Sequence, residues 1–116
     1  MNAAQVDLQQ LRIKHILYKA KVRSAVYGGT YDAGFFSRLG PVNIWFDSIG
    51  LPKYNHEPAM QQLNRLQQDI DLFVNHLANL YKKGKIEEAH DGLSIIEAKS
   101  AIFLSLVAEM EAKFGH

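Results

Sequence analysis

Two polar residues stand at positions where the helical pattern of the sequence predicts a buried face. His15 falls on the stripe of the first predicted helix, and Gln67 falls on the stripe of the second. A lone His or Gln inside a helical bundle is usually a hydrogen-bonded core residue, because an unpaired buried polar group costs about 1–3 kcal/mol. Taken singly, each residue is therefore expected to be structural.

A third polar residue, Asp71, raises the alternative that His15 and Gln67 belong to one shared site. Asp71 follows Gln67 by four positions, so both side chains lie on one face of a helix. If that face meets His15, the three residues form a polar cluster between helices, which is where bundles build metal and ligand sites. The alternatives are a residual metal or small-ligand site through His15 and Asp71, and a purely structural cluster.

The residue types suit zinc poorly. Zinc takes about four ligands from Cys, His, Asp or Glu, and the chain has no cysteine. The remaining histidines are scattered and form no H-x-x-x-H pair; they are His56, His76, His90 and His116. We expect no cofactor, and zinc stays an alternative only.

An acid–base pair is the enzymatic alternative for His15 and Asp71, since a carboxylate can orient and charge an imidazole. No nucleophile, cofactor loop or phosphate-binding glycine motif accompanies the two residues. We therefore expect a protein that is not an enzyme, in which a His–Asp contact would fix the register of two helices.

Three long apolar stripes predict the elements that position these residues. The first helix is predicted over 6–26 and ends at Gly28-Gly29. The second is predicted from Pro58 to about Lys83. The third is predicted to run unbroken over 86–114, with Gly92 as its weak point. Between the first two helices, the glycines and prolines of 30–54 predict an irregular connection with a short helix over 42–48. We expect an all-α four-helix bundle, with three long helices and a short one, formed as one domain by residues 1–116. The tight turn at Gly84 predicts that the last two long helices are antiparallel neighbours.

The composition argues against nucleic acid and membranes as partners of this protein. The formal net charge of +1 provides no field for nucleic acid or for an acidic membrane. The longest apolar run, 101–108, is far below the roughly 20 residues that cross a bilayer. With no signal-peptide pattern and no cysteine, we expect a cytoplasmic protein that neither binds nucleic acid nor inserts into a membrane.

Two segments resemble the chemoreceptor zinc-binding (CZB) domain of bacterial chemotaxis receptors and some diguanylate cyclases. The run KHILYK at 14–19 is similar to the first motif of that family. The segment GPVNIWFDSIG at 40–50 is similar to the second, with Trp45 and Gly50 matching. The third motif, H-x-x-x-H, has QQDID at 67–71 in its place. The resemblance covers nearly the whole chain.

The resemblance implies positions for the family's four zinc ligands. His15 is retained, while Gly40 takes the place of the cysteine and Gln67 and Asp71 take the places of the two later histidines. Three of four ligands are thus replaced. The resemblance implies a sensory or regulatory domain of bacterial signal transduction that forms a homodimer and tunes an attached signalling module, without binding zinc in the family's manner. A purely structural dimerisation module is the alternative.

Aromatic residues gather around the second motif. Tyr18, Phe35, Phe36, Trp45 and Phe46 are expected either to close the open end of the bundle or to line a small-molecule pocket where the irregular connection meets the helices. The sequence leaves open whether Trp45 is packed or exposed.

Overall fold

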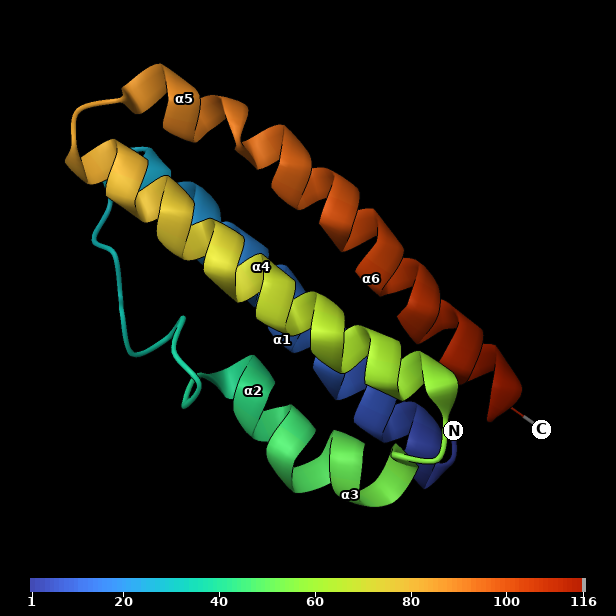
Figure 1. Ribbon diagram of the computed structural model, residues 1–116. Helices are drawn as coiled ribbons and strands as arrows, with labels where there is room; N and C mark the ends of the chain where they lie inside the picture. Colours follow the sequence, from blue (N-terminus) through green and yellow to red (C-terminus); the bar gives the residue numbers. More distant parts are fainter. Residues whose placement is uncertain (116) are drawn as a thin grey trace.

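The computed structural model describes residues 1–115, and all of their regular structure is helical. The elements are α1 (Ala3–Val26), α2 (Pro41–Trp45), the π-helical turn η1 (Phe46–Gly50), α3 (Leu51–Tyr54), α4 (Pro58–Lys82), α5 (Ile86–Asp91) and α6 (Leu93–Lys113). Because α2, η1 and α3 run on as one short helix, the predicted bundle of three long helices and one short helix is confirmed (Figure 1).

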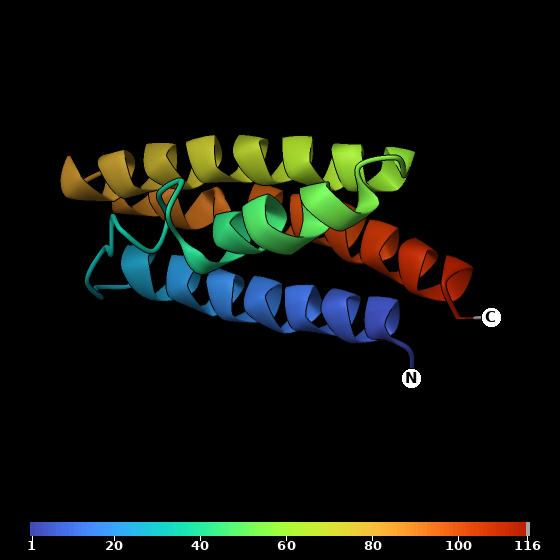
Figure 2. The same ribbon diagram turned by 90° about the horizontal axis from the view of Figure 1, so that it is seen from below.

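The long helices pack side by side in an elongated molecule of 50 × 24 × 21 Å. The antiparallel pairing of the last two long helices is confirmed, since α6 runs back along α4 (Figure 1). The short helix lies between α1 and α4 on the side away from α6 (Figure 2). This places three helices, α1, α2 and α4, around one shared interior.

The first helix begins earlier than the stripe predicted. Asn2 accepts a hydrogen bond from the backbone N–H of Gln5, and the Gln5 side chain accepts one from the Asn2 N–H, so a capping box starts the helix at Ala3. Gly28, with φ +94°, ends it as predicted. The predicted stripe is buried along its length: Leu8, Leu11, His15, Tyr18, Val22 and Ala25.

The prediction for the short helix was wrong in length, since it spans Pro41–Tyr54 rather than 42–48. Gly50 and Pro52 suggested irregular chain, yet both lie inside the helix. The π-helical turn explains this, because the ring of a helical proline clashes with the carbonyl four residues earlier, and a wider turn just before Pro52 relieves that clash.

The last predicted helix is not unbroken, because the chain turns at Gly92 between α5 and α6. A β-carbon on Gly92 would lie 2.2 Å from a terminal methyl of Leu77 on α4. The missing side chain lets the start of α6 approach α4 closely at this point. In the described part of the chain, no helix combines the length and apolar character needed to span a membrane.

Candidate functional site: a polar centre at Asp71

The carboxylate of Asp71 is the centre of a hydrogen-bonded cluster that joins three helices. Its Oδ1 accepts from the Tyr18 hydroxyl of α1 at 2.6 Å and from the Gln67 amide of α4 at 2.9 Å. Its Oδ2 accepts from the Asn43 amide of α2 at 2.8 Å. We call Asp71, Tyr18, Asn43 and Gln67 the polar centre. Three donors meet one carboxylate, so both of its oxygens are hydrogen-bonded.

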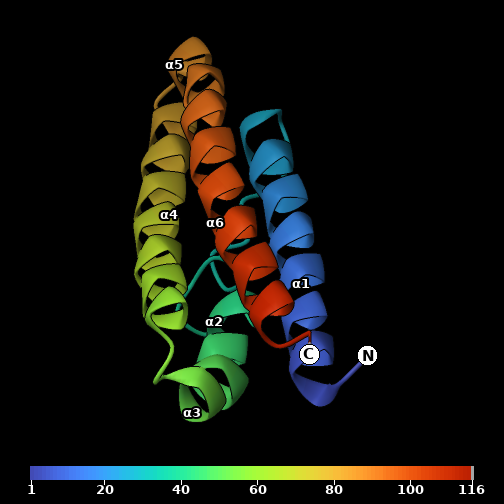
Figure 3. The same ribbon diagram turned by 90° about the vertical axis from the view of Figure 1, so that its right-hand side faces the viewer.

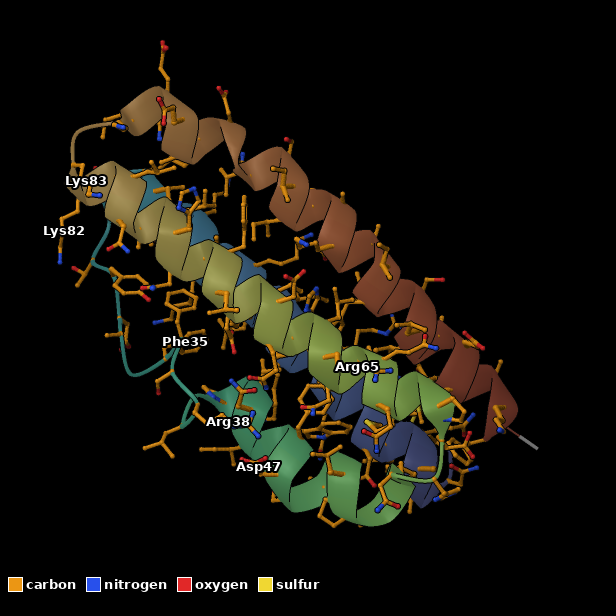
Figure 4. The ribbon with its side chains drawn as sticks, viewed as in Figure 1. Phe35, Arg38, Asp47, Arg65, Lys82 and Lys83 are labelled. Atoms are coloured by element: carbon orange, nitrogen blue, oxygen red, sulfur yellow. The ribbon has the colours of Figure 1, made fainter. Side chains whose placement is uncertain are left out.

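Arg38 connects the polar centre to the surface. Its guanidinium donates to the side-chain Oδ1 of Asn43 at 2.8 Å and to the Asp47 carboxylate at 2.7 Å. Figure 4 shows Arg38 and Asp47 side by side at the short helix. Asn43 is thereby oriented with its carbonyl toward Arg38 and its amide toward Asp71. The network continues from the interior to the surface, since half of the Arg38 side chain is exposed.

Burial and hydrogen bonding oppose each other at Asp71. Desolvation raises the pKa of Asp71, while the bonds from Tyr18, Asn43 and Gln67 and the charge of Arg38 act to lower it. Burial and the neighbouring carboxylate raise the pKa of Tyr18 far above its ordinary value. Tyr18 therefore stays a neutral hydroxyl that donates to the carboxylate, and the centre holds at most one negative charge.

His15 does not join this centre. Its Nε2 lies 2.8 Å from the Ser100 Oγ of α6, and its ring stacks on Phe103 with centroids 4.2 Å apart. Burial, with Lys19 and Arg12 nearby, lowers the pKa of His15 to about 4 against the opposing charge of Glu97. The imidazole is therefore neutral at pH 7, and its buried Nδ1 has no hydrogen-bond partner. We assign the proton to Nε2, because an unpaired buried N–H is rarer than an unpaired acceptor.

The structure thus separates the predicted site residues. It brings Gln67 and Asp71 together, and gives His15 and Asp71 different partners on different helices. Gly40 lies in the tight turn before α2, where a β-carbon would stand 1.9 Å from the Phe35 carbonyl oxygen. A cysteine at this position would need the backbone to move.

These residues do not fit zinc. Among residues 1–115, no group of three or more His, Cys, Asp or Glu side chains is placed to hold a metal ion. The Asp71 oxygens already accept from three donors, and Gln67 turns its amide N–H, not its oxygen, toward them. The polar centre is built to surround a carboxylate with donors, whereas a metal site surrounds a cation with acceptors.

Trp45 and Gly50 have a packing role. The indole is 1% exposed, and a β-carbon on Gly50 would lie 2.5 Å from its ring. The ring stands edge-on to Phe46, with centroids 5.3 Å apart. Trp45 is therefore packed rather than exposed, and Gly50 provides the surface on which it lies.

Several of these contacts are not apparent from the sequence. Tyr18 fits the inward stripe of the first helix as an apolar side chain, yet a buried hydroxyl needs a hydrogen-bond partner and so signals a polar site. Asn43 and Ser100 carried no signal, because one sits inside the second motif and the other within a continuous stripe. Asp7 was also missed: it is 9% exposed and accepts from the Tyr54 hydroxyl at 2.7 Å.

Comparisons with known proteins find no match for this chain: no protein-family model, no curated protein and no solved structure matches it. The functional argument therefore rests on the residues and contacts of this chain.

Proposed function

We propose that this chain is a non-catalytic sensory or regulatory domain of bacterial signal transduction, of the type attached to chemotaxis receptors or diguanylate cyclases, and that it acts in the cytoplasm. One observation carries the proposal: a hydrogen-bonded pair, the Gln67 amide and the Asp71 carboxylate, stands at two of the positions at which the resemblance places zinc ligands. In this reading the polar centre replaces the metal as the link between the short helix and the long ones.

The centre is suited to regulation because it ties a short element to two long ones. Asn43 is the contact from α2, while Tyr18 and Gln67 belong to α1 and α4. A change in charge or hydrogen bonding at Asp71 would strengthen or weaken the attachment of α2 to the bundle. Because α1 and α4 run the length of the bundle, they can carry that change to its ends. Small changes at such a site become movements of whole elements because packed interiors have discrete arrangements.

A non-catalytic role agrees with the chemistry of the two candidate residues. A general acid–base pair needs the imidazole and carboxylate within hydrogen-bond reach of one another or of one substrate. His15 instead pairs with Ser100 and stacks on Phe103, and the carboxylate of Asp71 is enclosed by donors from the protein itself.

Metal analysis tests the part of the proposal that concerns zinc. Protein purified without an affinity tag is expected to contain no stoichiometric zinc, and zinc titration of the metal-free form is expected to show no tight binding. Tight one-to-one binding that disappears in His15→Ala would show that a metal sensor has been retained, and the polar centre would then not be its replacement.

A fusion experiment tests the regulatory role. We would join the chain to a diguanylate cyclase catalytic domain and compare the cyclase rate of the parent fusion with that of Asp71→Asn. Loss of the Asp71 charge is expected to change the rate, whereas Asp69→Asn, two residues away on the exposed side of α4, is expected to leave it unchanged. Equal rates in all three fusions would argue against a regulatory polar centre.

A homodimerisation module is the second candidate. It is favoured by large apolar side chains that remain exposed on one side of the bundle, among them Ile13 at 65% and Ile16 at 55%. Dimerisation and regulation are compatible, since a paired domain can pass a change at its interior to two attached modules.

A further inference from the structure

The outer face of α1 carries bulky apolar side chains although it faces away from the core, with Gln9 and Gln10 exposed beside them. Val6, Ile13, Ile16 and Leu17 are between 41% and 65% exposed. Their spacing of seven, three and four places them on one side of the helix, opposite the buried stripe. Ala20, one turn on, is also exposed. The helix therefore presents a second apolar ridge to the outside, made of bulky side chains.

The outer face of α6 is a continuous run of small side chains. These residues are spaced alternately by four and three, and all are exposed: Ser94, Ala98, Ala101, Ser105, Ala108 and Ala112. This is the spacing of a helix-packing seam. Small side chains let another helix approach closely, so the run forms a shallow trough along α6.

The ridge and the trough lie on neighbouring helices. Figure 3 shows α6 beside α1, and side chains join the two helices at Arg12–Glu111 and at Lys19–Glu97. Ile16 lies on α1 between Arg12 and Lys19. The four charged side chains along this seam are therefore paired within one chain. We call the outer sides of α1 and α6 together the α1/α6 face.

Such a face is complementary to itself. A twofold axis between two copies places the bulky ridge of each α1 against the small-residue trough of the other α6, so the same contact forms twice. A ridge of bulky side chains seated against a trough of small ones is a contact between two protein surfaces, so the face is matched to a second copy of this chain.

The area is sufficient for a stable dimer. The 24 residues of α1 extend about 36 Å at about 1.5 Å per residue. Two helices whose axes lie about 10 Å apart present a face about 20 Å wide, hence about 700 Å² from each copy. The total of about 1,400 Å² falls within the range of about 1,200–2,000 Å² for specific interfaces.

We propose that the α1/α6 face binds a second copy of this chain, with the Ile13–Ile16 ridge of α1 seated in the Ala101–Ser105 trough of the partner's α6. The inference deepens the homodimer proposed above and rests on it. It does not depend on the polar centre, which lies on the other side of α1.

Sedimentation equilibrium of the complete chain and three variants tests this. The parent chain is expected to be a reversible dimer. Ile13→Glu, which places a charge on the ridge, and Ala101→Trp, which fills the trough, are each expected to raise the dimer dissociation constant by at least about 30-fold. Leu72→Glu is the control, because Leu72 is 72% exposed on α4, outside the face, and it is expected to leave the dissociation constant unchanged.

The three substituted positions are exposed, so far-ultraviolet circular dichroism should show an intact fold in each variant. A strict monomer, or a dimer that neither variant weakens, would overturn the proposal. Tighter association of Ala101→Trp would also overturn it, because it would indicate nonspecific hydrophobic association rather than a trough fitted to the ridge. Binding of the monomer to phosphatidylserine vesicles, lost in Ile13→Glu, would assign the face to a membrane instead. Failure of the zinc or fusion experiments leaves these results untouched.

Discussion

At the scale of single residues, this protein surrounds two polar groups differently: His15 in the core and Asp71 half-buried at its edge. Asp71 accepts hydrogen bonds from three donors, which partly offset the desolvation of its charged form. His15 has one polar partner and an aromatic ring, so only its neutral form is accommodated. The two sites should therefore respond differently to pH and to substitution.

His15 should make the protein less stable in mild acid. Its pKa is about 4 when folded and close to 6.5 when unfolded, so between these values the unfolded chain binds more protons and stability falls as pH falls. At pH 5 the loss relative to pH 8 from this residue is about 2 kcal/mol. Urea unfolding at the two pH values measures it.

The variant His15→Gln is the control for that prediction, because Gln keeps a donor for Ser100 and does not titrate. Its stability should differ less between pH 8 and pH 5 than that of the parent chain. The raised pKa of Asp71 has the opposite effect. The folded protein binds this proton more tightly than the unfolded chain does, so the contribution of Asp71 to stability increases as pH falls. An equal pH dependence in both proteins would show that His15 is not the group responsible.

Replacing Asp71 should be costly, because it leaves three buried donors without an acceptor. Asp71→Ala is expected to lower the free energy of unfolding by about 3 kcal/mol or more, since each unsatisfied buried group costs about 1–3 kcal/mol. Asp69→Ala is the matched control. Its carboxylate is more than half exposed and pairs with Lys99, so its loss should cost less than about 1 kcal/mol. Similar losses in both variants, measured by urea unfolding, would contradict the account of the polar centre.

At the scale of elements, the short helix is defined by close packing at glycines. Trp45 lies against Gly50, and Gly40 lies against the Phe35 carbonyl. Gly50 also faces α4, since a β-carbon there would lie 3.1 Å from the Met60 sulfur, so the absence of a side chain lets the short helix approach α4 closely. Glycine is required at both positions because of the neighbouring atoms, since neither residue has a positive φ.

Gly50→Ala tests this packing. A methyl group would stand 2.5 Å from the indole and 3.1 Å from the Met60 sulfur. The variant is expected to be destabilised by about 1–3 kcal/mol through overpacking, although alanine favours a helix by about 1 kcal/mol elsewhere. Gly34→Ala is the control, because its nearest neighbour is a side-chain oxygen at 3.5 Å. Thermal unfolding that ranks Gly34→Ala as the more damaging change would refute the packing role.

At the scale of the whole molecule, ion pairs hold the register of α6 against its neighbours. Lys99 pairs with Asp69 on α4, and Arg12 and Lys19 of α1 pair with Glu111 and Glu97. All are partly exposed, so each is worth at most about 1 kcal/mol. The stability of the bundle comes instead from its core, in which Phe103 packs against both His15 and Phe46.

High salt should therefore have a small effect. In 1 M sodium chloride, where charges are screened within about 3 Å, the free energy of unfolding is expected to fall by no more than about 2 kcal/mol. Phe103→Ala should cost about 3–5 kcal/mol in the same assay, because it leaves a cavity. A bundle that unfolds in salt alone would show that the ion pairs, and not the core, dominate.

The sequence determined the helices and their buried faces. Periodicity of three and four residues marks a stripe wherever one face must leave water, so the stripes of α1, α4 and α6 could be read directly. Capping residues and glycines fixed most ends. Where prediction failed, at η1 and at Gly92, the cause is a contact or steric effect beyond the stripe pattern: the proline ring of Pro52 within the short helix and the side chain of Leu77 against α5–α6.

The tertiary structure alone decided which polar residues meet. Sequence spacing paired Gln67 with Asp71 because both lie on one helix, and that contact exists at 2.9 Å. It allowed His15 to join them, because His15 occupies the inward stripe of α1 and Gln67 that of α4. A stripe fixes only the side of a helix that is buried, however, and the rotation and offset of neighbouring helices decide which partner each side chain meets. These are set by packing over the whole core, and here they bring Tyr18 and Asn43 to Asp71 and Ser100 to His15.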